Sequence, residues 1–114
     1  MLDGIVMRVI GTTDASAVDG ATRLVFTQRR TRVVGRYQGG NIRRGLLAGT
    51  LSKDGLEFRY AQVESSGAIH GGRSMCEIIR NADGSLRIIE HFVWRTRAGS
   101  GTNVFDQVEG AAVE

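Results

Sequence analysis

Few residues of this 114-residue chain could do chemistry by themselves. It carries two histidines, His70 and His91, and a single cysteine, Cys76. Nucleophilic catalysis by a triad needs a serine, a histidine and an acid that converge on one point. If His70 and Ser74 share a strand, they lie about 13 Å apart along it, too far for a direct hydrogen bond. The sequence therefore predicts no triad, and no residue is assigned a catalytic role.

Glu90 is the acid whose position is most informative. His91 follows it directly, so in a strand the two side chains point to opposite faces. Glycoside hydrolysis would need Glu64 to face Glu90, but the strand pairing described below puts them at opposite ends of the sheet. His70 and Cys76 are also too far apart to share a metal ion. Glu90 remains as a buried carboxyl that bonds a ligand or a neighbouring strand, or acts as an acid or base on a small metabolite.

Turn residues indicate which elements position these groups. The 16 glycines and the lack of proline favour hydrogen-bonded strands joined by tight turns. Because the connections are short, neighbouring strands should be antiparallel. We expect an all-β fold, a single antiparallel up-and-down barrel of about eight strands that forms one domain over residues 1–114. The β-branched and aromatic runs predict strands at residues 4–12, 21–29, 32–38, 42–51, 56–64, 68–80, 85–97 and 102–109.

Glycine-containing loops also predict how the strands pair. Loops ending in Gly55, Gly67 and Gly84 resemble three-residue hairpin loops, and a two-residue turn at Gly39–Gly40 would align Tyr37 with Ile42. Counting from these turns gives rows of inward-facing residues: Thr50, Phe58, Ser74 and Phe92; Ala48, Tyr60, Gly72 and Trp94; Leu46, Gln62, His70 and Thr96; Arg44, Glu64, Ala68 and Ala98. Glu90 and Cys76 lie one row beyond Phe92. Arg44 opposite Glu64 predicts a cross-strand ion pair.

The inward face combines aromatic rings with a few polar groups. Small residues opposite the rings leave room for a cavity, which is the usual composition of a small-molecule site; a barrel filled by its own side chains is the alternative. We expect a small molecule to bind in the interior without catalysis, with no cofactor and no metal. The predicted ligand-binding residues are Arg44, Tyr60, Gln62, His70, Ser74, Glu90, Phe92 and Trp94.

Three groups of motifs carry a family resemblance. They are Tyr37-x-Gly39-Gly40-x-Ile42-x-x-Gly45-x-Leu47, Arg59-Tyr60-x-Gln62-Val63 and Gly84-x-Leu86-Arg87-Ile88-x-Glu90-x-Phe92-x-Trp94. Over residues 21–109 the chain resembles a family of small bacterial proteins of unknown function that often carry the inherited name N-acetylglutamate synthase. The resemblance implies a lipocalin-like β-barrel. An acetyltransferase binds the pyrophosphate of acetyl-CoA at a helix start after a glycine-containing turn, and no such turn is found here.

The charge is unevenly distributed. The chain has fourteen arginines and one lysine, with a net charge of +3 and an isoelectric point of about 9.7. Seven arginines and no acid lie between Gly20 and Ser52, so the Arg23–Arg44 region is a third candidate site, for a polyanion. However, Arg44 is predicted to point inward, and the aromatic rings that would stack on bases also do so. We therefore do not expect nucleic acid as a partner.

The remaining expectations concern location and assembly. No apolar run approaches the about 18 residues of a membrane span, and the lone Cys76 suits a reducing compartment, so we expect a cytoplasmic protein with no membrane partner. The outward face is rich in apolar residues, which predicts a homodimer. These residues are Leu47, Leu51, Val63, Met75, Ile79, Ile89 and Val93.

Overall fold

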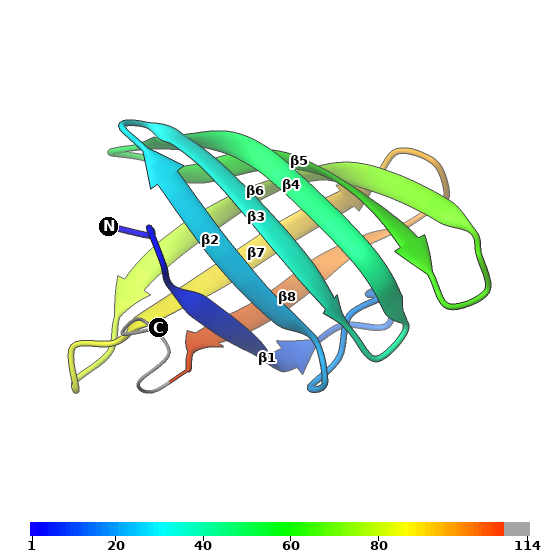
Figure 1. Cartoon of the computed structure of the whole chain (residues 1–114), viewed down its shortest axis with the longest axis horizontal. Coiled ribbons are helices and arrows are strands. Elements are labelled where there is room, and N and C mark those ends of the chain that lie inside the picture. Colours follow the sequence, from blue (N-terminus) through cyan, green and yellow to red (C-terminus); the bar gives the residue numbers. More distant parts are fainter. Residues whose placement is uncertain (109–114) are drawn as a thin grey trace.

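Eight strands follow one another in the computed structural model, which describes residues 1–108 (Figure 1). They are β1 (Val6–Thr12), β2 (Arg23–Arg29), β3 (Arg32–Gly39), β4 (Ile42–Ser52), β5 (Gly55–Glu64), β6 (Ile69–Arg80), β7 (Leu86–Trp94) and β8 (Ser100–Gln107). Each pairs antiparallel with the next, and β1 also pairs with β8, so the barrel is closed. The predicted all-β up-and-down barrel is confirmed. No helix of the described residues is long and apolar enough to cross a membrane.

The pairing of β5, β6 and β7 agrees with the prediction. Gln62 lies opposite His70, and Gly72 lies opposite Trp94. The β6–β7 loop ends in Gly84 with a φ of 89°, a left-handed backbone that glycine adopts readily. Inward and outward side chains therefore alternate as expected along these strands. Four predicted aromatic side chains line the interior: Phe58, Tyr60, Phe92 and Trp94.

The pairing of β4 with β5 is one residue out of the predicted register. The turn between them has two residues instead of three, so Ser52 faces Gly55. Leu47 consequently lies opposite Tyr60 and is buried, whereas the prediction placed it outside. Because side chains alternate with a period of two, a shift of one residue reverses every side chain of the strand. Three residues predicted to face inward are exposed instead: Leu46, Ala48 and Thr50.

The β3–β4 hairpin also departs from the prediction. Gly39 pairs with Ile42, and after a shift in register Tyr37 lies opposite Gly45. A Cβ atom at Gly45 would stand only 2.3 Å from the Tyr37 ring carbon Cζ, so the strand accommodates this ring because it has glycine there. The register between β4 and β5 shifts again between Ile42 and Arg44. The prediction that Arg44 points inward is wrong, because Arg44 is exposed on the outer surface.

The two ends of the barrel differ. The end that we call the mouth carries the loops at residues 13–22, 40–41, 65–68 and 95–99. The longest, the β1–β2 loop at residues 13–22, bends over the opening, where Trp94 Nε1 donates a hydrogen bond of 2.8 Å to the Ala15 carbonyl. The interior is densely packed. Its largest fully buried side chains are Phe26, Leu2, Met7, Leu56, Ile88 and Val33.

Candidate functional site

A cavity of about 40 Å³ lies inside the barrel, beneath the β1–β2 loop. At about 10–15 Å³ for each water molecule, it has room for about three or four. Its roof is the segment Ser16–Val18, and its walls come from strands on every side of the barrel. The wall residues are Leu24, Tyr37, Leu47, Phe58, Tyr60, Gln62, Glu90, Phe92, Trp94, Asn103 and Phe105.

Aromatic rings from β5 and β7 form one wall of the cavity. The rings of Tyr60 and Trp94 meet edge to face with centroids 5.4 Å apart, and Phe92 lies 5.9 Å from Trp94 in the same geometry. Edge-to-face contact places the positive edge of one ring on the negative face of the next. The cluster therefore fixes the shape of the wall and presents a mainly apolar surface.

Glu90 is buried within this apolar surface and is held by two neighbours. Ser74 Oγ donates a hydrogen bond of 2.5 Å to Glu90 Oε2, and Asn103 Nδ2 donates one of 3.0 Å to Glu90 Oε1. Burial raises the pKa of the Glu90 carboxyl, while these two hydrogen bonds partly oppose the rise. Glu90 is thus a carboxyl biased toward its neutral form and fixed in position by β6 and β8.

The hydroxyl of Tyr60 is the least satisfied polar group of the wall. It is buried, and it finds no hydrogen-bond partner among residues 1–108. Burial, followed by the charge of Glu90, raises the pKa of Tyr60, so the hydroxyl keeps its proton. Leaving a buried hydroxyl unpaired costs about 1–3 kcal/mol. A residue of the cavity wall therefore carries a hydrogen-bond donor that no group among residues 1–108 uses.

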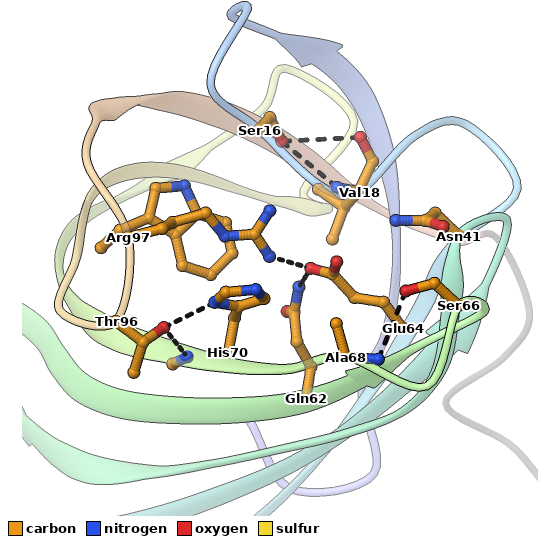
Figure 2. Close-up of polar contacts among 12 residues, drawn as sticks. Ser16, Val18, Asn41, Gln62, Glu64, Ser66, Ala68, His70, Thr96 and Arg97 are labelled. Carbon is orange, nitrogen blue, oxygen red and sulfur yellow. Dashed lines mark hydrogen bonds and ion pairs between the residues drawn. The ribbon is translucent and has the colours of Figure 1, made fainter.

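A chain of polar contacts connects the cavity wall with the mouth. Tyr37 donates from its hydroxyl to Gln62 Oε1 at 2.8 Å, and Gln62 Nε2 donates to Glu64 Oε2 at 2.7 Å. Glu64 in turn forms an ion pair with Arg97, which also lies 4.2 Å from the centre of the Trp94 ring. Figure 2 shows this arrangement of Gln62, Glu64 and Arg97. The predicted pairing of Glu64 with Arg44 is therefore wrong.

The roof segment is attached to the wall by side-chain hydrogen bonds. Ser16 Oγ donates to Asn103 Oδ1 at 2.6 Å, and the same Asn103 amide holds Glu90. Ala17 and Val18 pack against the core through their side chains. The loop thus covers the cavity with apolar groups, and the Ser16–Asn103 hydrogen bond fixes its position on the polar wall.

The structure brings most of the predicted site residues together. Ser74 contacts the cavity only through Glu90, and His70 lies at the mouth, where its Nδ1 is 2.8 Å from Thr96 Oγ1. Arg44 is on the outer surface and is not part of the site. The five that line the cavity are Tyr60, Gln62, Glu90, Phe92 and Trp94, and sequence reasoning missed Ser16, Tyr37, Asn103 and Arg97.

The fold and the site together define a closed antiparallel β-barrel with an interior cavity near one end, the architecture of barrels that hold one small ligand. Residues 1–108 match the family model described as avidin-like protein, and the chain therefore belongs to the avidin-like family. No curated protein and no solved structure matches the chain. The barrel implied by the earlier resemblance is correct, but the match supports neither the name N-acetylglutamate synthase nor a bacterial source.

Proposed function

We propose that the barrel interior binds a small, largely apolar and uncharged molecule and releases it unchanged. The observation that carries this proposal is the unpaired, buried Tyr60 hydroxyl beside a cavity that Tyr60 lines. Apolar cavities with a few convergent polar groups are the usual form of small-molecule sites. Membership of the avidin-like family agrees with such a role.

The polarity of the wall specifies the ligand. Tyr60 can donate one hydrogen bond, so the ligand should carry an acceptor such as a carbonyl oxygen. The nearby rings of Phe92 and Trp94 favour an apolar or flat body. A charged group would lose its hydration without gaining an ion pair, because burial favours the neutral form of the Glu90 carboxyl. We therefore expect a neutral ligand with a carbonyl-like group.

The size of the cavity implies movement of the roof. A volume of about 40 Å³ does not hold a metabolite, so a ligand must displace Ser16–Val18. The side chains of Ala17 and Val18 cover the cavity much as an apolar ligand would, and the displaced contacts are few. Binding thus exchanges loop contacts for ligand contacts.

One observation favours a second function, acid-base catalysis by Glu90. A carboxyl whose pKa is raised by burial keeps its proton to a higher pH than a free carboxyl and can deliver it to a substrate. Both Glu90 oxygens already accept hydrogen bonds, from Ser74 and Asn103. Hydrogen bonds to both oxygens are typical of a carboxyl with a structural or ligand-orienting role. For this reason we propose ligand binding as the first function and catalysis as the second.

A thermal-shift screen of neutral carbonyl-bearing fragments and metabolites tests the proposal. A ligand at 100 times its Kd adds about 2.7 kcal/mol of stability, a readily detected shift. Hits should bind the Tyr60→Phe variant about tenfold more weakly, because one hydrogen bond is lost. If no compound stabilises the protein, or if hits bind wild type and variant equally, the proposal fails.

The same hits separate binding from catalysis. Each is incubated with the wild-type protein and recovered for mass spectrometry, with the Glu90→Gln variant as the control. Unchanged recovery from both proteins supports binding alone. A product that forms with the wild type and not with Glu90→Gln would establish the catalytic alternative.

A further inference from the structure

The outer surface of β2, β3 and β4 is strongly and uniformly basic. These strands lie side by side (Figure 1), and residues 20–52 contain no acidic side chain. Arg44, which the sequence pattern assigned to the interior, is exposed and adds a positive charge to this surface. Six arginines of the three strands are exposed: Arg23, Arg29, Arg32, Arg36, Arg43 and Arg44.

Three of these arginines surround one hollow of about 570 Å³. Arg36 lies opposite Val25 on one side and Leu46 on the other. Arg23 and Arg44 stand two residues from those partners along their own strands, so they are the diagonal neighbours of Arg36, about 7–8 Å away between backbones. The hollow therefore has guanidinium groups on three strands and apolar side chains between them.

These charges are left uncompensated by the protein. None of Arg23, Arg36 and Arg44 forms an ion pair within residues 1–108. Arg23 Nη1 donates to the carbonyls of Gly20 and Thr22, at 2.9 and 3.2 Å, which orients that guanidinium beside the hollow. Clustered like charges repel one another, and a bound anion would reduce this repulsion.

We propose that this outer hollow is a second binding site, for the phosphate group of a small organic phosphate. Guanidinium groups match the oxygens of a phosphate through paired, charge-assisted hydrogen bonds. Val25 and Leu46, which are 43% and 51% exposed, provide an apolar floor for the organic part. The volume suits a small molecule, and none of the large hydrophobic side chains exposed in residues 1–108 is an aromatic ring on which nucleic acid bases could stack.

The test compares inorganic phosphate with phenyl phosphate by calorimetric titration at low ionic strength. Phenyl phosphate should bind more tightly, because its ring covers Val25 and Leu46. Arg36→Ala should weaken phenyl phosphate binding at least about tenfold, since it removes the central guanidinium. Arg29→Ala is the matched control: Arg29 is exposed on the same face of β2, but about 20 Å along the strand from Arg23. It should change the Kd less than twofold.

Several outcomes would overturn the assignment. These are no binding of either compound, equal binding of the two compounds, or equal losses in Arg36→Ala and Arg29→Ala, which would show a general charge effect. Binding of a duplex oligonucleotide that is tighter than that of phenyl phosphate would indicate a nucleic acid surface instead. Tyr60→Phe should leave phenyl phosphate binding unchanged, so the result does not depend on the interior site.

Discussion

Two tyrosines of the cavity wall have similar positions and opposite hydrogen-bonding states. The Tyr37 hydroxyl donates to Gln62, whereas the Tyr60 hydroxyl has no partner among residues 1–108. Tyr60→Phe should therefore raise the free energy of unfolding of the unliganded protein by about 1 kcal/mol, because a buried unpaired group is removed. Tyr37→Phe should lower it by about 1–2 kcal/mol, because the Gln62 oxygen loses its donor. Urea denaturation measures both.

The opposite signs make this comparison informative. A protein donor that is unpaired without ligand destabilises the free protein, and its hydrogen bond to the ligand stabilises the complex. Such a loss of stability is common at binding sites. If Tyr60→Phe destabilises the unliganded barrel as much as Tyr37→Phe does, the Tyr60 hydroxyl has a structural partner, such as an ordered water. The Tyr60 hydroxyl would then not be an unused donor.

The carboxyl of Glu90 makes stability depend on pH. Its pKa is raised in the folded protein by burial, so folding favours the protonated form. The stabilisation is fully present below the unfolded value of about 4.3 and is lost as pH rises toward the folded pKa, with a slope of at most about 1.4 kcal/mol per pH unit. Glu90→Gln, which keeps the shape and remains neutral, should flatten this part of the profile. Denaturation of both proteins between pH 4 and 8 gives the free energy of unfolding at each pH. If this free energy changes with pH in the same way for the two proteins, the pKa of Glu90 is not raised.

At the scale of strands, the close approach of β4 and β5 depends on one glycine. A Cβ atom at Gly49 would stand 1.9 Å from the Glu57 carbonyl oxygen, whereas one at Gly11 would only touch Val104 at 3.7 Å. Gly49→Ala should therefore destabilise the barrel by about 2–3 kcal/mol through overpacking against backbone. Gly11→Ala should be neutral or stabilising by about 0.5 kcal/mol, because it restricts only the unfolded chain. Equal midpoints of thermal unfolding for the two variants would rule out the β4–β5 register described above.

The sequence predicts the existence of the strands better than their register. Alternation and turn residues are local signals, and they suffice for all eight strands. Register depends on whether a turn contains two or three residues. The loop ending in Gly84 follows the predicted geometry, but Gly55, with a φ of 121°, closes a two-residue turn. Both loops end in Asp-Gly but differ at other positions: Ser85 bonds Asn81 and Asp83 beside Gly84, where the other loop has Leu56 after Gly55. The shared ending therefore does not fix the length of the turn.

The candidate site shows the same difference between residues that a turn places and residues that no turn places. Tyr60, Glu90 and Trp94 could be predicted, because β5 and β7 flank turns whose register was read correctly. Asn103 and Ser16 could not, because β8 and the β1–β2 loop lack turns that fix their position. A loop that bends over a barrel leaves no periodic signal in its sequence. Its contacts, such as that of Ala15 with Trp94, arise between residues far apart in the chain.

Over the whole molecule, the outer surface carries a basic region and a region of mixed character. The basic region covers β2–β4, and a region of mixed apolar, polar and charged side chains covers β4–β7 around a second hollow of about 610 Å³. Met75 and Val93 line that hollow and are 58% and 45% exposed. Arg59 and Arg73 lie directly opposite each other in the same region. Any partner of this surface must cover apolar side chains and tolerate a pair of like charges.

We expect the exposed apolar side chains of this mixed region to join two copies of the chain into a two-fold dimer, in which the same surface meets itself. The dimer would bring the Arg59–Arg73 pair of each copy together, so added salt should strengthen it: the Debye length falls from about 10 Å at 0.1 M to about 3 Å at 1 M. Light scattering at micromolar concentration should show a mass near twice 12.4 kDa that is favoured at high salt. Met75→Asp should return the protein to a monomer, whereas Ile10→Asp, on β1 and also exposed, should not. A mass of 12.4 kDa at every salt concentration would contradict the dimer, and it would mean that these apolar side chains remain in contact with water.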